Sequence, residues 1–176
     1  MNERIPILFD RALRPEWIDF ALEKRFQVDG ESAFRRAVRD HLARQMNGAE
    51  AVRKTVSQLQ RTVGFRTPIP EERLRASLEQ MHKLSPDART PVRLALLMQS
   101  QPFFADCVRA MRKLHALGIH GVTYQQMYER ISGKYGERGT VPRSLGRVLQ
   151  TLAFLGLARN EAKCWYLQDG ATMPVQ

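Results

Sequence analysis

Apolar residues recur every three or four positions through the first third of the chain, a spacing that places them on one face of an α-helix. We expect a first helix from Pro15, because proline fits the first turn of a helix, to the Asp-Gly pair at residues 29 and 30. Two further helices are expected over residues 31–46 and 49–64. Their predicted buried faces, with that of the first helix, comprise Trp17, Phe20, Ala21, Phe34, Val38, Leu42, Val52, Val56, Leu59 and Val63.

The segment FRTPIPEE interrupts this pattern, because Pro68 and Pro70 are incompatible with a continuous helix. A helix is expected over residues 72–84, and another begins near Pro91 with an apolar run that indicates burial on nearly all sides. We therefore expect an N-terminal basic helical region over residues 1–66, followed by central helices over residues 67–101.

The last part of the chain, residues 102–170, has a different order of elements. A long helix and a short link lead to Thr123, whose T-x-x-Q spacing to Gln126 predicts a capping box at the start of the next helix. Thr140 is expected to cap a further helix, which ends at Gly156, and two short strands should flank a polar turn at residues 160–163. This order is typical of a winged helix-turn-helix domain. The expected fold class is mainly α, an N-terminal helical bundle followed by a C-terminal winged helix-turn-helix with a short β-hairpin wing.

The net charge of the chain indicates what kind of partner the protein binds. The 176 residues carry a formal net charge of +10, with a sequence pI of about 10.3. Such an excess favours a polyanionic partner, either a nucleic acid or an anionic membrane surface. The alternative is a basic protein whose charge serves solubility or an acidic complex. No apolar run approaches the length of a membrane span, and the N-terminus lacks the apolar core of a secretory signal. We therefore expect a cytoplasmic protein with double-stranded DNA as its partner and no membrane partner.

The third helix of the predicted winged domain carries the candidate DNA contacts. In such domains the N-terminal half of this helix enters the major groove, and the wing reaches the flanking backbone. The planar guanidinium of arginine can bond a phosphate or a guanine edge at two points. The alternative is an ordinary solvated helix face, and winged domains also bind proteins. The predicted contacts are Arg138, Arg143, Ser144, Arg147 and Gln150 at the helix, with Arg159 and Lys163 on the wing.

A second candidate surface lies in the N-terminal region. Residues 31–66 hold eight basic residues against three acidic ones. The outer side of the helix over residues 49–64 offers Arg53, Lys54, Ser57 and Arg61, which could follow a phosphate backbone without reading sequence. A basic solvated face is an equally good interpretation.

Motifs for catalysis are absent from the sequence. It contains no phosphate-binding glycine loop, HExxH, GxSxG or kinase signature. Cys107 and Cys164 form no CxxC, and the four histidines have no metal-ligand spacing. We expect no cofactor, no metal and no enzymatic activity, and Cys107 is expected in the core.

Three segments carry a resemblance to a known family: RPEWIDFALEK, QPFFADCVRAM and YGERGTVPRSLGRVLQTLAFLGL. Together with helices that precede a winged domain in a small basic protein, they resemble the BrxA-like proteins of bacterial phage-exclusion (BREX) operons. The resemblance implies a DNA-binding accessory subunit of an antiviral defence system, with other proteins of that system as further partners.

The sequence therefore predicts a non-enzymatic DNA-binding protein of modest sequence specificity. Two alternatives are an assembly subunit of a larger nucleoprotein complex, whose winged domain binds protein, and a dimeric transcriptional repressor.

Overall fold

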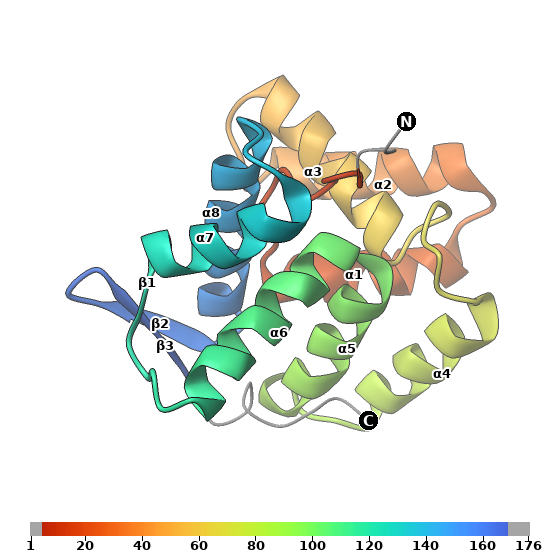
Figure 1. The fold of residues 1–176 in the computed structure, drawn as a ribbon. Helices are drawn as coiled ribbons and strands as arrows, with labels where there is room; N and C mark the ends of the chain where they lie inside the picture. The colour runs from red at the N-terminus through yellow and green to blue at the C-terminus, as the bar shows by residue number, and fades with distance from the viewer. Residues whose placement is uncertain (1–4, 169–176) are drawn as a thin grey trace. The chain divides into compact units, whose positions relative to one another are not determined.

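The computed structural model of the chain describes residues 5–168, which form two compact units (Figure 1). The helical unit comprises residues 13–101. The C-terminal unit comprises residues 102–168 together with the N-terminal segment up to Ala12. Within the described residues the fold is mainly α, with eight α-helices, one short 3-10 helix and a small antiparallel sheet. The expected fold class is confirmed at this level.

The helical unit contains five α-helices. They are α1 (Pro15–Gln27), α2 (Glu31–Ala43), α3 (Ala49–Thr62), α4 (Glu71–His82) and α5 (Thr90–Ser100), with the 3-10 helix η1 (Pro86–Arg89) before α5. Helix α1 packs against α2, α3, α4 and α5. The predicted inward faces are confirmed for α2 and α3, whereas Phe20 of α1 is only half-buried and stacks on His41. Helix α2 ends three residues before the predicted boundary at residue 46.

Segments on both sides of the proline linker contribute to this unit, since α3 packs against α5. The amide of Gln101 donates a 3.0 Å hydrogen bond to the hydroxyl of Thr62, and both side chains are buried. The expected separation of residues 1–66 from residues 67–101 as regions stays a prediction.

The C-terminal unit contains α6 (Pro102–Ala116), β1 (Val122–Thr123), α7 (Tyr124–Tyr135), α8 (Thr140–Phe154), β2 (Ala158–Glu161) and β3 (Cys164–Leu167). The strands form a three-stranded antiparallel sheet in the order β1-β3-β2. Figure 1 shows β2 and β3 as a hairpin that extends away from α7 and α8. The hairpin was predicted. The pairing of β1 with β3 was not, because a two-residue strand has no periodicity to detect.

Helix starts in this unit are set locally. The capping box at α7 is confirmed, since Thr123 Oγ1 accepts from the backbone N–H of Gln126 and Gln126 Oε1 accepts from that of Thr123. The predicted cap at Thr140 is wrong. Helix α8 begins at Thr140 itself, Gly139 occupies the N-cap position and no side chain caps it.

The N-terminal segment completes the core of the C-terminal unit. Phe9 is fully buried, and its ring centroid lies 5.4 Å from that of Phe104 on α6. Helix α8 contributes a buried apolar face to the same core, and Cys107 is buried as predicted. Phe9 and Phe104, which are 95 positions apart in sequence, therefore share one hydrophobic core.

Candidate nucleic-acid interface

The first turn of α8 is held against α7 by a hydrogen bond. The hydroxyl of Tyr124, the first residue of α7, donates to the carbonyl oxygen of Pro142 over 2.6 Å. Partial burial raises the pKa of Tyr124, which further favours the protonated hydroxyl that donates this bond. The capping box fixes the start of α7 and therefore the position of Tyr124. The hydrogen bond from Tyr124 to Pro142 in turn fixes the first turn of α8 relative to α7.

The outer face of α8 carries Arg143, Arg147 and Gln150. Arg143 and Gln150 are exposed and Arg147 is half-buried, and their spacings of four and three residues place them on one side of the helix. Arg147 Nη1 donates to Gln150 Oε1 over 3.3 Å. From Thr140 to Lys163 the sequence has one acidic residue, Glu161. This face therefore presents guanidinium and amide groups without a carboxylate on the helix.

Ser144 does not belong to that face. It was predicted to lie beside Arg143 and Arg147, but it is 4% exposed and lies among the buried residues of α8. The prediction that it points outward is wrong. Ser144 and Val148 are four positions apart, so both fall on the same buried side of the helix.

Arg138 has structural partners in the turn before α8. Its Nε donates to the carbonyl of Tyr135 over 2.9 Å, and its Nη2 donates to the carbonyl of Ile5 over 2.6 Å. The side chain thus ties the N-terminal segment to the end of α7. Arg138 was predicted to contact DNA, but its Nε and Nη2 groups already donate to backbone carbonyls within the protein.

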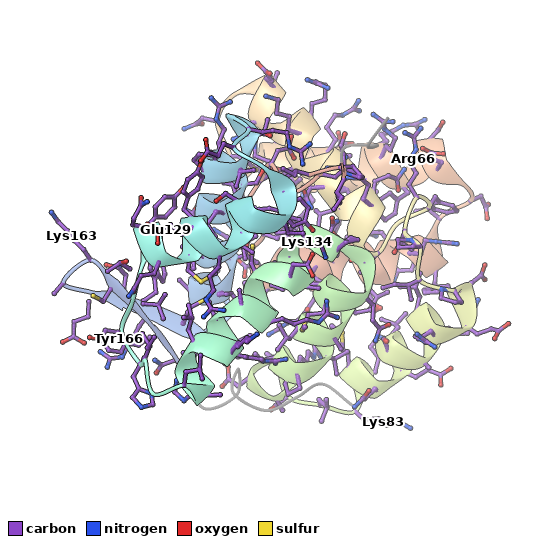
Figure 2. The ribbon with its side chains drawn as sticks, in the orientation of Figure 1. Arg66, Lys83, Glu129, Lys134, Lys163 and Tyr166 are labelled. Atoms are coloured by element: carbon purple, nitrogen blue, oxygen red, sulfur yellow. The ribbon has the colours of Figure 1, made fainter. Side chains whose placement is uncertain are left out.

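The hairpin places Arg159 and Lys163 on its surface. Lys163 is exposed and projects from the tip (Figure 2). Arg159 is paired with Glu161, two positions along the same strand β2, and its guanidinium carbon lies 4.8 Å from the ring centroid of Tyr166 on β3. Lys163 therefore offers a charge to solvent, whereas that of Arg159 is partly compensated.

The hairpin turn has an uncommon backbone conformation. Ala162 and Lys163 have φ values of 51° and 66°. Positive φ at both central residues is the signature of the type I′ turn, which suits the twist of a hairpin and normally selects asparagine or glycine. The turn chemistry therefore offers no reason for alanine and lysine at these positions.

The predicted contacts on α3 belong to the helical unit. Arg53 and Lys54 lie 3.9 Å and 3.0 Å from Oε1 of Glu50, and both are on the outer side of the helix. Arg61 and Ser57 are half-buried, and Arg61 donates to Gln58 Oε1 over 3.2 Å. The structure thus brings together Arg143, Arg147 and Gln150 on α8, while the α3 residues form a surface of the other unit.

Sequence reasoning missed two residues that position this site, Tyr124 and Asp106. Asp106 on α6 accepts hydrogen bonds from Tyr135 and Lys134 on α7. The signal for Tyr124 was an aromatic residue directly after the capping threonine. No sequence signal marks Asp106, because its partners lie 28 and 29 residues away.

Two general properties bear on the chemistry of the site. Among residues 5–168, no three or more His, Cys, Asp or Glu side chains come together in a way that could hold a metal ion. No helix in the same range has the length and apolar character needed to cross a bilayer.

No protein-family model matches the sequence, and no curated protein matches it either.

Proposed function

We propose that the C-terminal unit is a winged helix-turn-helix domain that binds double-stranded DNA without catalysing a reaction. The observation that carries the proposal is the element order α6-β1-α7-α8-β2-β3, with the strand order β1-β3-β2 and an arginine face on α8. In a winged domain of this order, α8 is the recognition helix and the β2–β3 turn is the wing. The formal charge of +10 supports a polyanionic partner.

Each proposed contact has a separate role. Arg143 and Arg147 enter the major groove, where a guanidinium can bond the O6 and N7 atoms of guanine or a phosphate. Gln150 lies farther along the same face and can bond adenine. Lys163 reaches the flanking backbone from the wing tip. With few base-reading groups on this face, we expect modest sequence specificity.

The resemblance to BrxA-like proteins extends this proposal. If it reflects common descent, the protein is an accessory subunit of a bacterial antiviral defence system. The extension rests on the three quoted sequence segments, and the DNA-binding proposal stands without it.

The test is fluorescence anisotropy with a random labelled duplex, from low to moderate salt. We expect Arg143→Ala/Arg147→Ala to weaken binding at least about tenfold, and the salt slope to fall by about 0.9 for each lost phosphate contact. The matched control is Lys113→Ala/Arg130→Ala, which removes the same charge from the surface between α6 and α7. Ser144→Ala is a second control, and its buried side chain predicts unchanged affinity.

Failure of the native chain to bind duplex at low salt would refute the proposal. Equal weakening by the α6–α7 control would also refute it, because binding would then follow net charge rather than the face of α8. Circular dichroism of each variant separates loss of contacts from loss of fold.

A specific observation favours one alternative, an assembly subunit whose winged domain binds protein. In the part of the chain that the structure describes, the exposed large apolar side chains are Ile5, Leu8, Leu117, Ile119 and Tyr124, and they belong to the C-terminal unit. Leu117 is 64% exposed, which suits a protein contact better than a phosphate contact. Leu117→Ser/Ile119→Ser distinguishes the two, since it should leave DNA affinity unchanged and weaken binding to a protein partner.

A further inference from the structure

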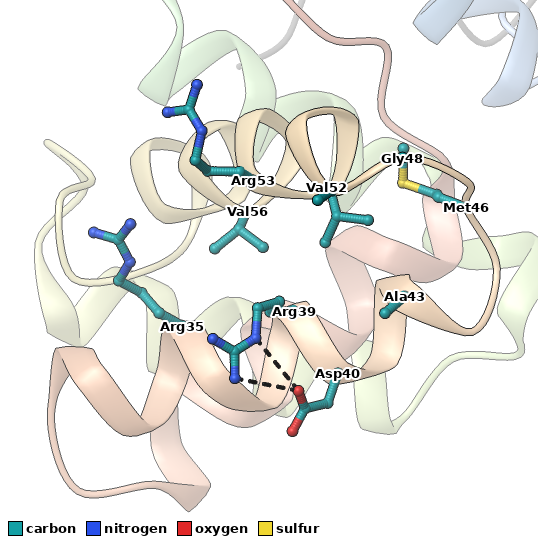
Figure 3. Close-up of a pocket in the computed structure, with 10 residues that line it drawn as sticks. Arg35, Arg39, Asp40, Ala43, Met46, Gly48, Val52, Arg53 and Val56 are labelled. Atoms are coloured by element: carbon teal, nitrogen blue, oxygen red, sulfur yellow. Dashed lines mark hydrogen bonds and ion pairs between the residues drawn. The ribbon is translucent and has the colours of Figure 1, made fainter.

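A groove with a volume of about 600 Å³ lies between α2 and α3 of the helical unit (Figure 3). Its apolar lining comes from Ala43, Met46, Ala49, Val52 and Val56. Figure 3 shows Val52 and Val56 pointing from α3 into the space between the helices, with Ala43 and Met46 toward the end where the two helices are joined. The groove belongs to one unit, so its geometry does not depend on the C-terminal unit.

The groove exists because the apolar stripes of α2 and α3 are wider than their mutual contact. Phe34, Val38 and Leu42 of α2 are buried in the unit's core, as is Leu59 of α3. Ala43 and Ala49 lie outside that contact and are exposed. The tight link between the helices, with Gly48 at a φ of 92°, keeps the two faces beside each other.

Arginines surround this apolar surface. Arg35 and Arg39 reach it from α2 and Arg53 from α3, against one acidic lining residue, Asp40. Asp40 lies 3.4 Å from Arg39, and Arg53 lies 3.9 Å from Glu50, and all four of these side chains are more than half exposed. Among residues 5–168, Arg35 has no acidic partner. The rim therefore has a net positive charge that is only weakly compensated.

An apolar lining with an arginine rim favours a peptide ligand over a polyanion such as a nucleic acid. A phosphate backbone would satisfy the arginines but leave the exposed surface of Ala43 and Ala49 and the half-buried Met46 in contact with water. An apolar ligand would cover that surface but leave the arginine charges without partners. An amphipathic helix with an apolar stripe and flanking carboxylates satisfies both, and a helix in a hydrophobic groove is a recurrent mode of peptide recognition.

We propose that the groove between α2 and α3 binds an acidic amphipathic helix of a partner protein. The lining of α2 from Arg35 to Ala43 spans about 12 Å, so the occupant contacts the groove over about two to three helical turns. Apolar side chains at i, i+3, i+4 and i+7 of the occupant cover Ala43, Met46 and Ala49 above the buried Val52 and Val56. Its Glu or Asp residues pair with Arg35, Arg39 and Arg53. This surface is additional to the proposed DNA face on α8.

The experiment uses the full chain and a labelled synthetic helix of about twelve residues, with leucines at the i, i+3, i+4 and i+7 positions and glutamates beside them. A peptide of the same composition with a scrambled order is the ligand control. Arg35→Glu/Arg53→Glu changes the charge of the rim. Arg36→Glu/Arg73→Glu makes the same change in net charge at exposed arginines that do not line the groove.

A second pair of variants tests the apolar surface. Ala43→Tyr fills part of the groove, and Ala76→Tyr places the same side chain on an exposed site of α4. The substituted alanines and arginines are all exposed, so we expect the two alanine variants and the two double arginine variants to fold. Circular dichroism of each variant checks this.

We expect saturable binding of the ordered peptide, weakened about tenfold by the rim variant and by Ala43→Tyr and changed less than about twofold by the two controls. Equal binding of the scrambled peptide would overturn the proposal, as would no saturable binding up to about 1 mM. It would also be overturned if the rim variant weakened duplex binding as much as Arg143→Ala/Arg147→Ala while Ala43→Tyr left peptide binding unchanged. The groove would then be a phosphate track.

Discussion

The hydroxyl of Tyr135 donates a 2.6 Å hydrogen bond to Oδ2 of Asp106 and so joins the end of α7 to the first half of α6. The same oxygen accepts from Nζ of Lys134 over 2.8 Å, and Arg109 lies 3.4 Å from the other oxygen. One carboxylate on α6 thus holds two neighbouring residues of α7. This contact sets how the helix that precedes the α8 face packs on the rest of its unit.

Asp106→Asn should destabilise the protein by about 1 to 3 kcal/mol, because it removes a charge-assisted acceptor from a mostly buried site. Partial burial by itself acts to raise the pKa of Asp106. The hydrogen bonds from Lys134 and Tyr135, with the charges of Lys134 and Arg109, outweigh it, so the pKa is lowered overall. Thermal unfolding of both proteins at neutral pH measures the difference.

The same pair predicts a pH dependence. Since the folded pKa of Asp106 lies below its unfolded value, the stabilisation is present above the unfolded pKa and is lost as pH falls through the folded pKa. The difference in unfolding free energy between native protein and Asp106→Asn should therefore shrink as the pH is lowered below about 4. A difference that stays constant into acid would mean that the carboxylate charge contributes nothing.

The second prediction concerns the helical unit, where Arg93 on α5 binds Asp19 on α1 through two bonds of 2.8 Å and 2.6 Å. Arg89 adds a contact of 3.2 Å to the same carboxylate, and the Arg93 side chain is only 8% exposed. Asp19→Asn should cost about 3 kcal/mol, because it leaves a buried guanidinium without its counter-charge.

Asp40→Asn is the control for that prediction. It breaks an ion pair with Arg39 in which both side chains are more than half exposed, and the expected change is below about 0.5 kcal/mol. Chemical denaturation of both variants measures the free energies of unfolding. Similar effects of the two substitutions would show that burial does not strengthen the Asp19 pair.

The third prediction separates stability from binding at the hairpin tip. Lys163→Gly should raise stability by about 0.5 to 1 kcal/mol, because glycine adopts positive φ without strain, and should weaken duplex binding by removing a wing charge. Ala162→Gly should give the same gain in stability without loss of affinity. Unfolding and anisotropy measurements on both variants test this, and unchanged affinity in Lys163→Gly would remove the wing tip from the proposed interface.

The fourth prediction concerns Arg138. Arg138→Ala should loosen the N-terminal segment, because it removes the bond to the carbonyl of Ile5, and should leave duplex affinity within about twofold. Hydrogen exchange over residues 5–12 is expected to accelerate, with Phe9 still anchoring the segment in the core. If duplex affinity instead falls as far as in Arg143→Ala/Arg147→Ala, Arg138 contacts DNA as the sequence analysis predicted.

Local patterns determined much of the described fold. The start of α1 at Pro15, the capping box of Thr123 and Gln126, and the hairpin around residues 160–163 were all predicted from the sequence. Each depends on groups within a few positions of one another, so the sequence alone contains the interaction. The predicted outer face of the last helix comprised Arg143, Ser144, Arg147 and Gln150. Helical spacing puts Arg143, Arg147 and Gln150 on one side of α8, whereas Ser144 is buried.

Only the tertiary structure decided the features that join distant segments. It places Phe9 on Phe104, pairs Asp19 with Arg93 and gives Arg138 a partner at Ile5. The burial of Ser144 is different, since its four-residue spacing from the buried Val148 could have been read from the sequence. The groove between α2 and α3, in contrast, has the same origin as the contacts between distant segments. Periodicity shows which residues are apolar, but which of them stay uncovered depends on contacts between helices, and a single-helix pattern does not contain them.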